Sequence, residues 1–365
     1  MECDAPRPDL GLPGLDLPGL DLPGLDAWLP RHIRGSDPPY SYELIPGGRS
    51  NLTYKVTDSL GARLVLRRPP VSHVLPTAHD VVREHAVISA LDGTGIPVPP
   101  ALAVCEDPGV TGAPFFVMGY VDGVVVRDAP GALALEEASR RHAGEALVDA
   151  LADIHSLDVD AAGLGRLGPR EGYVERQLRR WHRQLCASEG QLGQPVPAAH
   201  AAHAALREAM PPERPASLVH GDYRLDNTVL ASSGELRAIL DWELCTLGNP
   251  MADLGLLQVY WREPGDSLAA LAGGSPGAPA GEATVVDGFP SRAELADRYA
   301  RRSGRDLSDL GYFVALGFWK LACILQGVHA RYAAGAQGGD PRGIEDLPGR
   351  VQALAEASLD LVGAA

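Results

Sequence analysis

LVHGDYRLDNTVLASSGELRAILDW, residues 218–242, alternates short apolar runs with polar side chains. An apolar start leads into the polar octet His220–Asn227. Two further apolar runs, at residues 228–230 and 238–240, lie on either side of a Ser-Ser-Gly-Glu turn. Short apolar runs separated by a turn of this kind predict a β-hairpin with polar residues at its ends.

The polar residues of this segment suggest a particular chemistry. Asp222, Asn227 and Asp241 offer carboxylate and amide oxygens, which are the ligands that Mg²⁺ prefers in proteins. A carboxylate can also accept the proton of a hydroxyl nucleophile. Phosphoryl transfer by kinase-like enzymes needs these two functions side by side, so the segment favours a small-molecule kinase.

Composition narrows the classes of protein that the chain can belong to. Its 365 residues suit one large or two medium domains, and 45% apolar residues allow an ample core. The net charge of −15 argues against binding to nucleic acid or to an anionic membrane, because both need a basic face. The five cysteines form no Cys-x-x-Cys pair, which predicts reduced thiols in a cytoplasmic protein, with neither zinc nor a disulfide.

Two segments bear on targeting and membranes. The first residues lack a basic stretch followed by an apolar core, so no secretory signal is expected. Residues 311–328 are apolar enough to raise the question of a membrane helix, but Lys320 lies at the centre. A lysine there would cost roughly 3 kcal/mol in a membrane, so a buried core helix is the preferred interpretation.

Residues 1–39 are expected to be a flexible N-terminal tail. Tandem Leu-Pro-Gly-Leu-Asp repeats begin at Leu12, Leu17 and Leu22. A five-residue repeat with Pro and Gly in every copy matches neither helical nor strand periodicity. A docking peptide is the alternative interpretation of the same repeats.

Residues 40–123 are expected to form a small antiparallel sheet with one helix. Strand patterns at residues 42–45 and 52–56 flank a glycine-rich turn. The turn contains Gly47, Gly48, Ser50 and Asn51. Glycines let backbone amides approach an anion, so this turn could fold over nucleotide phosphates, although a plain hairpin is the alternative.

The remaining patterns of this region supply charged side chains. A strand pattern at Arg63–Arg68 ends in cations that could hold phosphates, with a solvated strand end as the alternative. A helical pattern at residues 80–91 leaves Glu84 off its apolar stripe, where it can pair with a strand cation. Strand patterns at residues 102–105 and 114–121 complete the sheet.

Residues 124–365 are expected to be mainly helical. The expected helices cover residues 136–157, 173–188, 197–210, 291–302, 311–332 and 348–361. Ser291 and Glu294 have the spacing of a capping box. His155 is interpreted as a structural histidine near a helix end. The arginines at positions 179, 180 and 183 could hold an anionic substrate group, but a solvated face is the simpler interpretation.

The assembled order of motifs resembles the aminoglycoside phosphotransferase / choline kinase-like family, distant relatives of the protein kinases. The motifs are the glycine-rich hairpin, the cationic strand, the glutamate helix, His-Gly-Asp-x-x-x-x-Asn at 220–227 and Ile-Leu-Asp-Trp-Glu at 239–243. The amino-acid sequence at residues 66–70, 248–253 and 320–326 is most similar to one branch of this family. That branch includes the kinase-like domain fused to some acyl-CoA dehydrogenases.

The resemblance implies a two-lobed, protein-kinase-like α+β fold and a role for each motif residue in the second lobe. It implies that Asp222 positions the acceptor hydroxyl and takes its proton. Asn227 and Asp241 match the Mg²⁺ ligands. His220 matches a histidine that is structural rather than chemical. Asp253 matches an aspartate that accepts hydrogen bonds from the backbone of the catalytic loop.

The resemblance also implies nucleotide-binding residues in residues 40–123. The glycine-rich turn is one part of this set. Glu84 matches the helix glutamate that forms an ion pair with a strand lysine in the family. Arg67 stands at the position of that lysine, and Arg68 is the alternative. The hinge beside the adenine ring matches Met118, Gly119 and Val121. The guanidinium group of arginine is planar and bulkier than the lysine ammonium group, so an arginine–glutamate pair cannot have the usual lysine–glutamate geometry.

The predicted function is transfer of the γ-phosphoryl group of ATP or GTP, with Mg²⁺, to a hydroxyl of a small metabolite. A hydroxyacyl compound is preferred as acceptor, and an aminoglycoside is the alternative. The alternative of another class is a pseudokinase that binds nucleotide without turnover, which Arg67 favours and the intact Asp222, Asn227 and Asp241 oppose. No nucleic acid, membrane or obligatory protein partner is expected.

Overall fold

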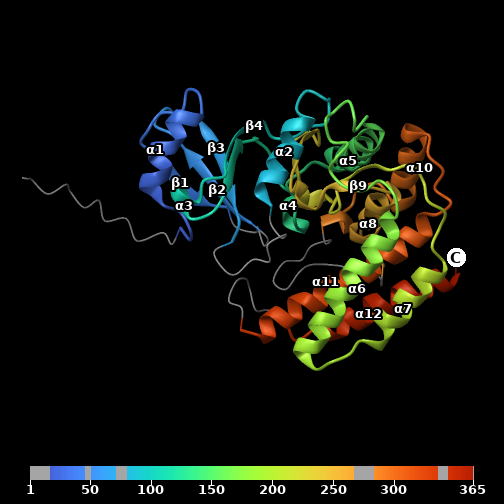
Figure 1. The fold of residues 1–365 in the computed structure, drawn as a ribbon. Helices are drawn as coiled ribbons and strands as arrows, with labels where there is room; N and C mark the ends of the chain where they lie inside the picture. The colour runs from blue at the N-terminus through green and yellow to red at the C-terminus, as the bar shows by residue number, and fades with distance from the viewer. Residues whose placement is uncertain (1–16, 46–50, 71–79, 267–282, 336–343, 365) are drawn as a thin grey trace, which may run out of the picture. The chain divides into compact units, whose positions relative to one another are not determined.

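The computed structural model describes residues 17–45, 51–70, 80–266, 283–335 and 344–364. The chain divides into two compact units. Figure 1 labels helices and strands of both units. The first consists of Met1–Val82 and Leu102–Tyr120, and the second of Arg83–Ala101 and Val121–Ala365. The last residue of the first unit is Tyr120, and the boundary expected at residue 123 stays a prediction. Residues 83–101, however, group with the second unit rather than with the sheet.

A five-stranded sheet is the frame of the first unit. Its strands are β1 (Ser41–Leu44), β2 (Leu52–Thr57), β3 (Arg63–Arg68), β4 (Ala101–Cys105) and β5 (Phe115–Gly119). The strand order is β1-β2-β3-β5-β4, and the pairs β1–β2, β2–β3 and β3–β5 are antiparallel. The strands predicted for this region are therefore confirmed, and a short helix α3 (Pro108–Thr111) follows β4.

Helix α1 (Leu22–His32) corrects the expectation that residues 1–39 form a flexible tail. Asp21 is its N-cap, and the carboxylate accepts a hydrogen bond from the Gly24 N–H at 3.2 Å. Pro23 lies in the first turn, where the N–H that proline lacks would have no helical partner. The repeat that begins at Leu17 therefore supplies the N-cap, and the repeat that begins at Leu22 supplies the first turn of the helix. The five-residue period of the sequence hides these helix signals.

The same helix completes the core of the first unit. Leu25 and Leu29 are four residues apart on one face and are fully buried. Trp28 packs edge-on against Phe115 of β5, with ring centroids 4.9 Å apart. The core lies between α1 and one face of the sheet. The repeat that begins at Leu12 lies outside the described residues.

The second unit is mainly helical. Its helices are α2 (Val81–Leu91, whose first two residues belong to the first unit), α4 (Ala129–Leu133), α5 (Glu137–Ser156), α6 (Tyr173–Leu192), α7 (Pro197–Glu208), α8 (Met251–Tyr260), α10 (Arg292–Ser303), α11 (Leu310–Ala333) and α12 (Leu347–Ala364). The predicted long helices are confirmed. The capping box at Ser291 is present at the start of α10.

Helix α11 is the central helix of this unit. It packs against α6, α7, α8 and α12 (Figure 1). It is long and apolar enough to cross a membrane, but 72% of its most apolar window is buried inside the protein. The interpretation of residues 311–332 as a buried core helix is confirmed.

Leu29→Ala should lower the free energy of unfolding by about 2–5 kcal/mol, because it removes a fully buried side chain from the α1 core. Leu60→Ala is the matched control, since Leu60 is 75% exposed in the same unit, and it should change stability by no more than about 0.5 kcal/mol. Urea denaturation followed by circular dichroism measures both. Equally small losses in the two variants would contradict the packing of α1.

Candidate active site

Two short antiparallel ladders build the loop that carries the polar octet. Strand β6 (Ser217–Val219) enters the loop and pairs with β9 (Thr246–Gly248). After the 3-10 turn Leu225–Asn227, β7 (Thr228–Leu230) pairs with β8 (Leu236–Ile239). The predicted hairpin is confirmed. The pairing of the first apolar run with residues 246–248 was not foreseen.

The structure brings the three predicted chemical residues to the open end of this hairpin. Asn227 Nδ2 donates to the Asp222 carboxylate at 3.1 Å and to its backbone carbonyl at 2.9 Å. Asp241 lies one residue beyond Leu240, whose N–H donates to the Asn227 carbonyl at 2.8 Å. Asp241 has φ +66°, the only positive value of a non-glycine residue in the described ranges. Strained backbone of this kind often marks a functional position.

Asp222 is held as a carboxylate. Arg224 lies beside it, with Nε 3.3 Å from Asp222 Oδ2. Burial would raise the pKa of the Asp222 carboxyl, but the charges of Arg224 and Lys320 outweigh it and hold this pKa below its usual value. The side chain keeps 23% of its surface exposed, so an ionised oxygen can reach a ligand.

Asp253 of α8 fixes the backbone of the loop. Its carboxylate accepts hydrogen bonds from the N–H groups of His220 at 2.6 Å and Gly221 at 2.8 Å. Only 1% of the residue is exposed. Burial would raise the pKa of the Asp253 carboxyl, but the hydrogen bonds from His155 and from the Gly221 N–H hold this pKa below its usual value. The predicted role of Asp253 agrees with these contacts.

Both histidines near the loop have structural contacts, as the sequence suggested. His155 lies between the Tyr299 hydroxyl at 2.7 Å and Asp253 at 3.3 Å, and burial lowers its pKa. His220 Nε2 lies 2.9 Å from the Leu240 carbonyl, while its Nδ1 faces the Asp222 N–H at 3.3 Å. In the second contact Nδ1 is the acceptor, so Nε2 is the nitrogen that donates to the Leu240 carbonyl.

The predicted nucleotide residues are distributed over both units. Gly47, Gly48 and Ser50 lie outside the described residues. Asn51 is buried just before β2, and Gly119 ends β5 in the first unit. The second unit contains Glu84, which is buried in α2, and Val121, which follows the sheet. The ion pair of Glu84 with a strand arginine stays a prediction.

Strand alternation distinguishes Arg67 from Arg68. Arg67 is opposite Phe116 in the β3–β5 ladder, and Met118 is opposite Val65, so these side chains share one face of the sheet. Arg68 points to the other face, where the α1 core lies, and its Nη1 donates to the Thr111 carbonyl at 3.1 Å. Arg68 therefore has a structural role, and Arg67 remains the candidate for phosphate.

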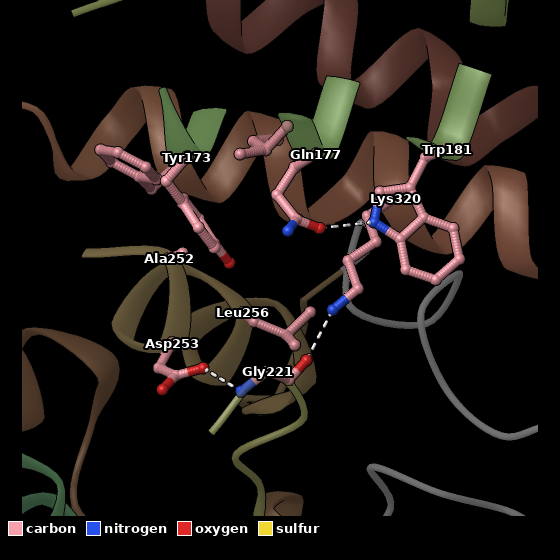
Figure 2. A pocket seen from close by; sticks show the side chains of 11 residues that line it. Tyr173, Gln177, Trp181, Gly221, Ala252, Asp253, Leu256 and Lys320 are labelled. Atoms are coloured by element: carbon pink, nitrogen blue, oxygen red, sulfur yellow. Dashed lines mark hydrogen bonds between the residues drawn. The ribbon is translucent and has the colours of Figure 1, made fainter. Parts of the chain in front are cut away.

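A pocket lies beside Gly221, the residue that precedes Asp222 in the chain (Figure 2). Its lining comes from α6, α8 and α11. The lining residues are Tyr173, Gln177, Trp181, Gly221, Ala252, Asp253, Leu256, Phe313, Leu316, Gly317 and Lys320. Lys320 Nζ donates to the Gly221 carbonyl at 2.6 Å and lies 5.5 Å from the centre of the Trp181 ring.

Sequence reasoning missed this pocket, although one signal was available. A lysine at the centre of an apolar helix must find a polar partner when that helix is buried. Lys320 served only to argue against a membrane helix. The same observation could have marked it as a residue that faces a functional loop.

An ionised carboxylate beside an amide and a second aspartate, on a loop of the helical unit in a chain that also has a sheet unit, defines a kinase-type phosphotransferase. A sequence profile of the Phosphotransferase enzyme family matches residues 41–310. The chain belongs to this family.

Relatives in sequence are much longer proteins. Acyl-CoA dehydrogenase family member 11 of Rattus norvegicus is 36% identical over 320 residues, which cover 86% of this chain and 39% of the relative. Acyl-CoA dehydrogenase family member 10 of Mus musculus is 34% identical over 290 residues, or 79% of this chain and 26% of the relative. The chain therefore spans about two fifths or less of the length of these relatives.

Solved structures share the fold. A protein of Ralstonia eutropha, described provisionally as an aminoglycoside phosphotransferase, matches with a TM-score of 0.75 and 31% identity over 94% of this chain and 98% of that one. Spectinomycin phosphotransferase APH(9)-Ia, solved with ADP and spectinomycin, has a TM-score of 0.58 and 11% identity over 92% of this chain and 97% of its own. The second likeness concerns the fold alone. The two-lobed, kinase-like α+β fold is confirmed.

Asp253→Asn should lower the free energy of unfolding by about 1–3 kcal/mol at pH 7, because an amide oxygen cannot serve both buried N–H donors. Asp153→Asn is the control: Asp153 forms an exposed ion pair with Arg302, worth about 1 kcal/mol or less. Chemical denaturation measures both variants.

The pH dependence provides a second measurement. Since folding lowers the pKa of Asp253, its contribution is present above the unfolded pKa of about 3.9 and declines as the pH falls through the lowered value. The difference between wild type and Asp253→Asn should therefore narrow in acid. A difference that stays constant down to the lowest measurable pH would contradict this assignment.

Proposed function

We propose that the protein transfers the γ-phosphoryl group of ATP or GTP to a hydroxyl group of a small metabolite. The observation that carries this proposal is the Asp222 carboxylate, ionised by its surroundings and held on a loop whose backbone is fixed by Asp253. Membership of the phosphotransferase family and the kinase-like fold support the class of reaction.

Asp222 would orient the acceptor and take its proton. The hydroxyl oxygen forms a bond to the γ-phosphorus while the bond from that phosphorus to the β–γ bridging oxygen breaks. The hydroxyl proton goes to the Asp222 carboxylate, and the nucleoside diphosphate leaves. Arg224 and Asn227 hold the carboxylate from two sides, which keeps one orientation for the incoming hydroxyl.

The side chains of Asn227 and Asp241 fit a magnesium site in their chemistry. The amide nitrogen of Asn227 is used by Asp222, so its oxygen is the atom that would contact a cation. Asp241 adds a carboxylate oxygen at the same open end of the hairpin, just beyond β8, and hard oxygen donors suit Mg²⁺. Bound Mg²⁺ would offset the negative charge of the nucleotide phosphates.

The proposed nucleotide-binding residues are those that the resemblance of the sequence motifs implies. Arg67 would neutralise phosphate charge from the sheet face that also carries Met118, while Gly119 and Val121 would offer backbone groups to the base. The glycine-rich turn with Gly47, Gly48, Ser50 and Asn51 would supply amides to the phosphates. Glu84 would pair with Arg67.

The lining of the pocket beside Gly221 favours an acyl acceptor over a polycationic one. Most of the lining is apolar or aromatic, and its cation is Lys320. The carboxylate among the lining residues, Asp253, is already used by two backbone N–H groups. An aminoglycoside carries several positive charges and would need carboxylates there, whereas an acyl group with an anionic end would fit apolar walls and a lysine. The acyl-CoA dehydrogenase relatives agree with this choice.

Acceptor binding would require the pocket walls to move. The enclosed volume is about 20 Å³, which is room for about one water molecule. Arg180 precedes Trp181 of the pocket wall in the chain and is exposed, with its guanidinium 4.9 Å from the centre of the Trp181 ring. This arginine, which the sequence marked as part of a basic patch, would meet the anionic end of the acceptor.

A pseudokinase is the second candidate function. Arginine stands where the family has lysine, at Arg67, and that difference favours nucleotide binding without turnover. The ionised state of Asp222 and its contact with Asn227 favour turnover instead.

Asp222→Asn should reduce phosphate transfer by about 10²–10⁴-fold, because it removes the proton acceptor but keeps the shape of the side chain. Nucleotide binding, measured by thermal shift with ATP or GTP and Mg²⁺, should be unchanged. The assay uses purified protein and a panel of hydroxyacyl compounds, their CoA thioesters and aminoglycosides, with the exposed Asp160→Asn as control. Wild-type protein that binds nucleotide but phosphorylates no member of the panel would favour the pseudokinase. Wild-type protein that binds no nucleotide would overturn the kinase proposal.

Arg180→Gln should raise KM for an anionic hydroxyacyl acceptor by about 2- to 5-fold, which corresponds to an exposed ion pair, and should leave KM for ATP unchanged. Arg179→Gln is the matched control. Arg179 is also exposed on α6 but is rotated by about 160° from Gln177 of the pocket wall, since successive helix residues turn by about 100°. Equal changes in KM for the acceptor in the two variants would show that Arg180 does not contact the anionic end of the acceptor.

A further inference from the structure

Three metal-ligating side chains meet between α6 and α7, away from the loop of Asp222. His182 and Cys186 are four residues apart and share one face of α6, and His200 reaches them from α7. His182 Nε2 lies 3.1 Å from His200 Nδ1 and 3.9 Å from Cys186 Sγ. The nearest ligand atoms of the three residues all lie within 4.8 Å of one another.

These separations are close to those of a tetrahedral zinc site. With Zn–N bonds near 2.0–2.1 Å and Zn–S bonds near 2.3 Å, a tetrahedron places two nitrogens roughly 3.3 Å apart and nitrogen and sulfur roughly 3.6 Å apart. A small rotation of the exposed Cys186 side chain would close the remaining gap.

A carboxylate supports one of the ligands from behind. Both oxygens of Glu189 lie within 3.0 Å of His200 Nε2, and one of them also accepts the Val196 N–H at 2.7 Å. A carboxylate that holds one ring nitrogen of a ligating histidine directs the other nitrogen to the metal. The proton of His200 is thus on Nε2, and Nδ1 offers its lone pair toward His182.

Stacked rings hold His182 in place. The rings of His182 and His203 are nearly parallel, with centroids 4.0 Å apart, and His203 stacks in turn on Trp319 of α11. The Trp319 indole N–H donates to the Ala199 carbonyl of α7 at 2.8 Å. The ligand atoms are therefore preorganised before any metal arrives, which lowers the cost of binding.

We propose that His182, Cys186 and His200 bind one Zn²⁺ ion that links α6 to α7. Imidazole and thiolate ligands suit Zn²⁺ and do not suit Mg²⁺, so this site would be distinct from Asn227 and Asp241. A site with three protein ligands keeps a fourth position, here on the side of the exposed Cys186, for water. The cysteine spacing alone predicted no zinc, because the two histidines that complete the set are not in a recognised spacing with Cys186.

Binding requires two proton movements within the cluster. Cys186 loses its thiol proton to solvent, and His182 moves its own proton from Nε2 to Nδ1, so that both nitrogens facing the ion are unprotonated. The ion would then replace the direct hydrogen bond between His182 and His200.

Metal binding to the full chain tests this proposal. Protein stripped with a chelator is titrated with Zn²⁺ against a chromophoric competitor, and with Co²⁺ to follow the absorption of a thiolate-bound ion. One equivalent should bind, the cobalt complex should show thiolate-to-metal charge transfer, and the thermal midpoint should rise.

Variants assign the ligands. Cys186→Ser should abolish the charge-transfer absorption, and His200→Ala should weaken zinc binding by more than 100-fold. Glu189→Gln should weaken it by about 10–100-fold. His142→Ala, an exposed histidine on α5, and Asp241→Asn should bind zinc like the wild type. Absence of stoichiometric binding by the wild type, or wild-type zinc affinity in both Cys186→Ser and His200→Ala, would overturn the proposal.

Discussion

The backbone of Gly221 is the point on which the candidate active site depends. Its N–H donates to Asp253 at 2.8 Å, and its carbonyl accepts from Lys320 at 2.6 Å. Asp253 comes from α8 and Lys320 from α11, so two packed helices fix the two peptide groups that flank the Gly221 Cα (Figure 2). Gly221 has φ +87°, and a Cβ atom there would lie 2.8 Å from the Leu244 carbonyl oxygen, so the position requires glycine.

Burying a carboxylate and a lysine at this point is tolerable because each has partners. Asp253 receives two backbone N–H groups and the His155 ring, which together replace the water that burial removes. Burial lowers the pKa of Lys320, and the negative charge of Asp222 opposes that change. The charge of Lys320 and the charge of Asp222 therefore stabilise one another, and the orientation of Asp222 follows from helix packing as well as from the loop.

Local patterns were sufficient for the loop and the sheet. The octet at residues 220–227 lies between apolar runs, and the hairpin register then brings Asn227 and Asp241 together without help from distant residues. The helix α1 was missed because its repeat suggested a linker, although Asp21, Pro23 and the Leu25–Leu29 spacing are helix signals. Lys320 was missed for a different reason: its partner lies 99 residues upstream, and no local pattern specifies such a contact.

The candidate chemical residues and the pocket belong to different parts of the second unit. The loop supplies Asp222 and its neighbours, while α6 contributes Tyr173, Gln177 and Trp181 to the pocket wall at a spacing of four residues. The wall can therefore change its chemistry without disturbing the Gly221 peptide or the carboxylate beside it. Under the proposed function, this separation would let one phosphotransferase fold serve acceptors of different chemistry. Because His182 follows Trp181 directly, whatever fixes α6 against α7 also limits how far that wall can move.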